Sequence, residues 1–155
     1  MESLSLTDRQ TALHILDRIE EAINTVQIRN SVIRNADDFL LTPEGREKLD
    51  AACMVIEAIG ESFKNLDKLT KFDLLPLYPS IEWKEVKGVR DVIAHHYFDI
   101  DANEIFSIIN NDFDSLKDAV VPQTRRTLFA TPFPAPVITA IIGDWLSIYL
   151  INTFS

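Results

Sequence analysis

The sequence predicts an all-α fold, a bundle of four helices followed by a C-terminal tail. Apolar residues recur at three- and four-residue spacing in separate stretches of the chain, which is the period of an amphipathic helix. No stretch of convincing length alternates as a half-buried strand would, and the sequence has no glycine-rich phosphate loop or internal repeat. The 155 residues suit one domain, and a hydrophobic content of 46% is enough for a buried core.

The first two helices are marked by capping residues. Residues 7–10, Thr-Asp-Arg-Gln, have the pattern of a capping box and predict a helix over roughly 8–30, with Thr7 as its cap. Residues 42–44, Thr-Pro-Glu, predict the next start, because proline in the first turn loses an amide that has no partner there. The second helix carries small residues such as Gly60 on its apolar stripe, so a neighbouring helix can approach closely.

Two further helices follow a break in the chain. The break covers residues 65–80, which contain two prolines, and Ser80 is placed to cap the third helix. Asp101 is followed three residues later by Glu104 and caps a fourth helix, whose apolar stripe extends to Val120.

The tail differs in composition from the rest. We assign residues 1–125 to the helical domain and 126–155 to a proline-containing linker and an amphipathic C-terminal helix over 137–151. This helix is short for a membrane span and carries Asp144 in its middle, so we expect no stable membrane insertion. It could be a fifth helix that closes the bundle or a dimer, or it could dock on a partner or a membrane surface.

Charge and cysteine content limit the partners and the compartment. A net charge of −9 and a pI of about 4.7 argue against broad DNA binding, although they leave room for a local RNA site. The single cysteine, Cys53, cannot form an internal disulfide or a thiolate metal cluster, and it falls on an apolar stripe that indicates the core. Together with the lack of a signal peptide pattern at the start, this predicts a cytoplasmic protein.

The chemistry is concentrated in residues 90–97, Arg-Asp-Val-Ile-Ala-His-His-Tyr. A guanidinium can hold a phosphate and stabilise its growing charge, and an imidazole can move protons near neutral pH, so Arg90 and His95 suit RNA cleavage without a metal. On an ideal helix, however, the two side chains point about 140° apart. Either a loosened helix end or a second copy of the chain would bring such groups together. Alternatively, His95 is a structural histidine bonded to the backbone.

Metal and cofactor chemistry are poorly supported by the sequence. His95 and His96 are neighbours rather than four residues apart on one helical face, and there is no cysteine cluster. We therefore expect no metal site and no cofactor.

Read as Arg-x4-His-x-Tyr, residues 90–97 resemble the signature of HEPN-type proteins, specifically the HepT toxins of bacterial and archaeal toxin–antitoxin pairs. The flanking residues are similar to this family in the same order, and the resemblance extends from about the first helix to Val121. The similar flanks are residues 56–61, 80–83, 88–89 and 98–101. The resemblance implies a HEPN-type up-and-down four-helix bundle and a homodimer in which two motifs line one cleft, with Arg90 and His95 as catalytic residues.

The resemblance also implies a role for Tyr97. In HepT-like toxins the matching tyrosine receives AMP from an MntA-type nucleotidyltransferase antitoxin, which adds bulk and negative charge that would repel RNA phosphates. The alternative is a tyrosine that packs its ring after a helix and bonds its hydroxyl.

Four nearby residues have supporting or auxiliary interpretations. Asp91 would fix the guanidinium of Arg90, at a position where the family commonly has Asn, and His96 is a surface or auxiliary residue. Glu57 and Glu61 form either a solvated acidic face or a pair that orients the basic groups of the motif or a partner.

The predicted function is thus the toxin of a type VII-like toxin–antitoxin pair, a metal-independent endoribonuclease. Its expected partners are a second copy, the nucleotidyltransferase antitoxin and RNA, with tRNA and mRNA both open as targets. The alternative is a non-catalytic HEPN module that forms a complex with the nucleotidyltransferase or binds RNA or nucleotide.

Overall fold

The computed structural model describes residues 4–117 and 121–130, and these residues are helical with no strand. The helices are α1 (Leu6–Arg29), α2 (Pro43–Leu69), α3 (Trp83–His96), α4 (Ala102–Ser107), α5 (Phe113–Ser115) and α6 (Val121–Ala130). Short 3-10 helices are η1 (Ala36–Phe39), η2 (Leu75–Leu77) and η3 (Tyr97–Asp99), and the π-helical segment η4 (Ile108–Asp112) joins α4 to α5. The predicted all-α class is therefore confirmed.

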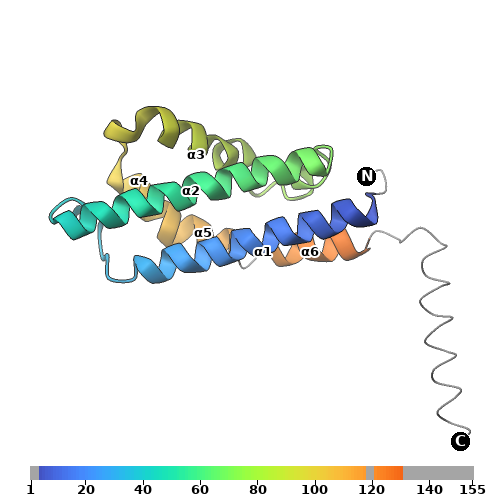
Figure 1. Cartoon of the computed structure of the whole chain (residues 1–155), viewed down its shortest axis with the longest axis horizontal. Helices are drawn as coiled ribbons and strands as arrows, with labels where there is room; N and C mark the ends of the chain where they lie inside the picture. The colour runs from blue at the N-terminus through green and yellow to red at the C-terminus, as the bar shows by residue number, and fades with distance from the viewer. Residues whose placement is uncertain (1–3, 118–120, 131–155) are drawn as a thin grey trace, which may run out of the picture.

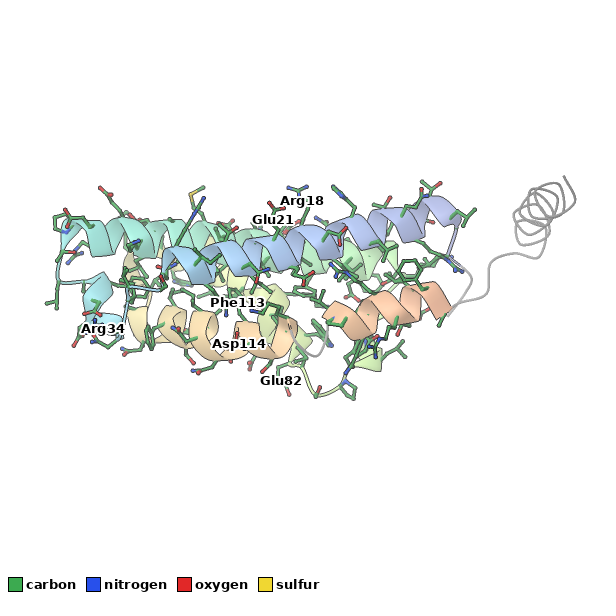
Figure 2. The ribbon with its side chains drawn as sticks, turned by 90° about the horizontal axis from the view of Figure 1, so that it is seen from below. Arg18, Glu21, Arg34, Glu82, Phe113 and Asp114 are labelled. Carbon is green, nitrogen blue, oxygen red and sulfur yellow. The ribbon has the colours of Figure 1, made fainter. Side chains whose placement is uncertain are left out.

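The helices form an up-and-down bundle. In Figure 1, α2 lies between α3 and α1, and both neighbours pack against it. The continuous helical run 102–117, which comprises α4, η4, α5 and the two residues after α5, packs against α1, α2 and η1. Figure 2 shows this run and α6 in a layer beside the long pair α1 and α2. This is the four-helix arrangement that the apolar periodicity predicted, with α6 added.

Two of the four predicted helix caps are confirmed. The Thr42 hydroxyl accepts a hydrogen bond from the Gly45 amide at 3.0 Å, and α2 begins at Pro43. The Asp101 carboxylate accepts from the Asn103 amide at 2.8 Å at the start of α4. Each cap satisfies an amide that has no partner inside its helix.

The other two predicted caps are wrong. Helix α1 begins at Leu6 because the Ser5 hydroxyl accepts from the Asp8 amide at 3.0 Å, so Thr7 lies inside the first turn instead of capping it. Helix α3 begins after Glu82 with no side-chain cap, because Ser80 belongs to a tight turn in which the Ile81 amide donates to the Tyr78 carbonyl.

The sequence analysis did not predict α6. A proline at its second residue, Pro122, was a usable signal, since proline is favoured in the first turn of a helix. Arg125 of α6 contacts Asp17 and Glu20 of α1, each at 2.6 Å, which ties the helix to the bundle. The predicted domain boundary at 125 falls inside α6, and it stays a prediction.

The predicted C-terminal helix over 137–151 lies outside the described residues. Among the helices that are described, none is both long enough and apolar enough to cross a bilayer.

The core follows the predicted apolar stripes. Every fourth or third residue of α1 and α2 is buried, including Leu16, Ile23, Ile56 and Phe63. Cys53 is also buried, at 2% exposure, so its predicted place in the core is confirmed. Burial of these apolar side chains is the main term that stabilises the bundle.

Helices α2 and α3 approach closely at Gly60, as the small residue predicted. A Cβ atom added at Gly60 would lie 3.1 Å from the Val86 carbonyl oxygen and 3.2 Å from Val89 Cγ1. Gly88, in the middle of α3, would meet nothing within 4 Å. The two glycines therefore have the same helical backbone but very different surroundings.

This contrast gives a matched pair of substitutions. We expect Gly88→Ala to raise the free energy of unfolding by about 1 kcal/mol, because alanine loses less backbone entropy in a helix. Gly60→Ala has the same entropic advantage but must move α3, so we expect it to be neutral or destabilising. Urea unfolding of both variants measures the difference, and equal stabilisation by both would contradict the close approach.

Candidate active site

Helix α3 is held along α2 by contacts at its first two turns. The rings of Phe63 and Trp83 pack with their centroids 5.3 Å apart, and the Trp83 indole donates to the Tyr78 carbonyl at 3.0 Å. Lys87 Nζ lies 2.5 Å from an oxygen of Asp67, which is buried. A buried carboxylate is costly without a cation, so this pair fixes the register of the two antiparallel helices.

Arg90 emerges from this packing into a cluster of carboxylates. Its Nη1 donates to Asp91 Oδ1 at 2.8 Å, and its Nε lies 3.5 Å from Glu61 Oε2 and 4.0 Å from Glu57 Oε1. The Arg90 side chain keeps 40% exposure. The contacts that the sequence analysis expected of Asp91, Glu57 and Glu61 are present, while the functional roles of these residues stay predictions.

The structure adds Lys64 to this cluster. Lys64 Nζ donates to the second oxygen of Asp91 at 2.9 Å, so one carboxylate bridges two cations from different helices. The hydrogen bond from Arg90, followed by that from Lys64, lowers the pKa of Asp91, and the same bond to Asp91 raises the pKa of Arg90.

His95 lies in the last turn of α3 and is exposed. Within the described residues its imidazole makes no hydrogen bond, so nothing there supports a structural histidine bonded to the backbone. No hydrogen bond or ion pair between described residues joins His95 to Arg90 either. One chain therefore presents the two groups on the same helix without bringing them together.

Helix α3 ends at His96, where the backbone leaves the helical region with φ −126° and ψ 28°. The helix thus continues past His95, and its end does not bring His95 and Arg90 together. His96 lines a groove between α3 and the 102–117 run, and His95 does not line it. The adjacent histidines thus serve different surfaces.

Tyr97 is the first residue of η3 and is 45% exposed. Its hydroxyl donates to Asp50 Oδ1 at 2.6 Å, and its ring meets the ring of Phe98 edge to face at 5.5 Å. The hydrogen bond that the phenol donates to Asp50 stabilises the protonated form, so Asp50 raises the pKa of Tyr97.

The sequence analysis missed Lys64 and Asp50 as members of this site. Both lie on the face of α2 that carries Glu57 and Glu61, since positions 50, 57, 61 and 64 are separated by seven, four and three residues. A charged stripe at this spacing was visible in the sequence. The sequence did not show that α3 and Tyr97 would lie against this stripe.

Two further candidates are the thiol of Cys53 and a metal site. Burial raises the pKa of the Cys53 thiol to about 11, with a contribution from Asp50, so the thiolate required of a nucleophile or a metal ligand is disfavoured. In the part of the chain that the structure describes, no group of three or more His, Cys, Asp or Glu side chains is placed to hold a metal ion.

An exposed guanidinium, an imidazole without a partner and an exposed phenol therefore meet solvent along the last two turns of α3 and the start of η3. An all-α bundle that carries Arg-x4-His-x-Tyr at this place has the features of a HEPN-type protein. The chain belongs to the ribonuclease HepT-like family, whose sequence profile matches residues 12–122.

Curated relatives are similar over most of this region. A probable ribonuclease HepT of Thermococcus cleftensis is 28% identical over 103 residues, which cover 65% of this chain and 87% of the relative. Two putative RNases of Methanocaldococcus jannaschii are 30% identical over 97 residues and 24% identical over 115 residues. These alignments cover 63% and 74% of this chain, and 73% and 97% of the respective relatives. No solved structure is significantly similar to the chain.

The hydrogen bond between Tyr97 and Asp50 can be tested by titration. We expect Asp50→Ala to lower the pKa of Tyr97, because the substitution removes both the acceptor of the phenolic proton and a negative charge that opposes tyrosinate. Ultraviolet difference titration follows tyrosinate formation, and Tyr97→Phe identifies the signal. Glu47→Ala, one turn away on α2, is the control and should leave the pKa of Tyr97 unchanged. An unchanged titration in Asp50→Ala would contradict the bond.

Proposed function

We propose that this chain is a metal-independent endoribonuclease in which Arg90 and His95 are the catalytic residues. The family assignment and the names of the relatives support ribonuclease activity. The observation that carries the site assignment is the state of His95, an exposed imidazole in the last turn of α3 without a partner among the described residues. An imidazole in this state is available to exchange protons with a bound substrate.

The two groups divide the chemistry of phosphodiester cleavage. Arg90 holds the scissile phosphate and stabilises the negative charge that grows on it. His95 moves a proton to or from the 2′-hydroxyl or the leaving oxygen. Attack of the 2′-oxygen on phosphorus expels the 5′-oxygen, which leaves a cyclic phosphate and a free 5′-hydroxyl.

A second copy of the chain would complete this site. Side chains five positions apart point about 140° from one another on a helix, and the two groups make no contact in one chain. We infer a homodimer in which the α3 ends of two copies face one cleft, so that Arg90 of one copy serves with His95 of the other.

The carboxylates around Arg90 set a condition on RNA binding. A phosphate has to replace at least one of the three acidic partners of Arg90. Lys64 makes this exchange easier, because it holds Asp91 by the other oxygen and can retain it when Arg90 turns to the phosphate.

We further propose that the chain is the toxin of a cytoplasmic toxin–antitoxin pair and that a nucleotidyltransferase partner silences it at Tyr97. The exposed phenol is accessible, and Asp50, 2.6 Å away, can accept its proton. The phenolic oxygen would attack the α-phosphorus of ATP and release pyrophosphate. The attached AMP would place negative charge beside the site and repel RNA.

The acidic surroundings of Arg90 favour one competing function, a non-catalytic module that binds its partner or RNA. Three carboxylates around the guanidinium weaken its hold on phosphate. Purified protein that binds RNA but never cleaves it would support this alternative.

Single substitutions of the two catalytic residues should abolish cleavage. We expect Arg90→Ala and His95→Ala each to lower the cleavage rate of a labelled single-stranded RNA by roughly 100- to 10,000-fold, because each removes charge stabilisation or proton transfer. His96→Ala is the matched control and should retain activity, since His96 lines the groove, which His95 and Arg90 do not. EDTA should have no effect. Unchanged cleavage by either variant would refute the assignment.

Modification of Tyr97 has a separate test. Coexpression with the cognate nucleotidyltransferase should add the mass of one AMP to the intact protein, and Tyr97→Phe should abolish this addition. Growth arrest caused by the unmodified chain should be relieved by the partner and also by His95→Ala. A label that persists in Tyr97→Phe would move the modification to another residue.

A further inference from the structure

The bundle has an open side between α3 and the 102–117 run. Helix α3 packs extensively on α2 but has almost no packing against that run. A groove of about 780 Å³ lies between them. Its apolar lining comes from α2, α3 and the 102–117 run and includes Ile56, Ile59, Val89, Ile93, Ile105 and Ile108.

Several apolar side chains in this groove remain in contact with water. Val92 is 49% exposed, and Val86, Val89 and Ile108 are only partly buried. Apolar surface is therefore exposed on both walls of the groove, which is typical of a place where another helix packs.

Acidic residues surround the apolar lining. The six carboxylates are Glu82, Glu85, Asp99, Asp101, Glu104 and Asp112, and no Lys or Arg is among the described lining residues. Glu82, just before α3, and Phe113, at the start of α5, both line the groove, and Figure 2 labels them. These charges repel RNA, and they also oppose face-to-face pairing with the same groove of a second copy.

We propose that residues 137–151 of the same chain occupy this groove as a fifth helix of the bundle. The segment carries an apolar stripe with two residues in every turn, and Asp144 is its single charged residue. A nearly uncharged helix can cover the apolar lining and leave the surrounding carboxylates hydrated, so the acidic residues present no obstacle.

The dimensions of the segment match those of the groove. A helix over 137–151 would be roughly 22 Å long, and α3, with 14 residues, is roughly 21 Å long. The six residues before it, 131–136, can span about 20 Å when extended.

The end of α6 also lies near one end of the groove, where the segment would have to enter. The hydroxyls of Tyr78 and Thr127 are 2.7 Å apart, so the end of α6 lies beside the 78–82 turn. Ser80 and Ile81 of this turn line one end of the groove. A segment that follows Ala130 therefore starts at this end and would run parallel to α3, with an effective concentration that no separate partner has.

The fifth helix would brace α3 along the face that lines the groove. It would cover His96 and Val92 while it leaves His95 and Arg90 open to RNA and to a second copy. The proposal is independent of the catalytic assignment, because it concerns only how the bundle is closed.

Cysteine cross-linking tests the proposal in the full chain. In a Cys53→Ala background, Gly88→Cys and Ile142→Cys should be linked within one chain by a short bismaleimide, since Gly88 lines the groove and has open space for a side chain. The control pair joins Ile142→Cys to Lys84→Cys, an exposed position one turn away that does not line the groove. We expect the control pair to react at least about tenfold more slowly.

A charge in the groove should release the segment. Adding Val92→Asp to the reactive pair should lower the cross-linking rate to that of the control, because it places a carboxylate against the apolar stripe. Met54→Asp, at an exposed position on α2 outside the groove, should leave the rate unchanged. Equal rates for the two pairs, or a product of doubled mass that shows a link between two copies, would overturn the proposal.

Discussion

The close approach of α3 to α2 is the constraint on which the rest of this structure depends. Gly60 permits this approach, because a Cβ atom there would lie 3.1 Å from the Val86 carbonyl oxygen, which is a tighter contact than most Cβ atoms make. The buried Asp67 then needs the ammonium of Lys87, which fixes the register along the helix pair. With this register set, Arg90 falls opposite Glu57 and Glu61, and Tyr97 falls opposite Asp50.

Electrostatic balance within this register explains how an acidic protein can present a cationic site. The overall charge is −9, yet Arg90 and Lys64 stand together on one surface because Asp91 binds both. The same carboxylates that position Arg90 compete with a phosphate for it. The arrangement therefore holds the guanidinium in place before RNA arrives, and part of the phosphate's binding energy is spent in displacing an acidic partner.

The end of α3 separates two surfaces with different tasks. His95 and Tyr97 face solvent, where the proposed second copy, RNA and the modifying partner would meet. His96 faces the groove toward the 102–117 run, where a further helix of the same chain would close the bundle. Adjacent residues can face different surfaces because each step along a helix turns the side chain by about 100°.

The sequence was enough to predict four of the helical stretches, most of their buried stripes, the Thr42 and Asp101 caps and the motif at 90–97, but it did not predict α6. It could do so because periodicity, capping and proline placement act over a few residues. The tertiary structure alone decided that Lys64 meets Asp91 across 27 positions and that Asp50 meets Tyr97 across 47. It also left the groove beside α3 open. These features depend on the register and distance between helices, which many distant side chains set together and no local pattern encodes.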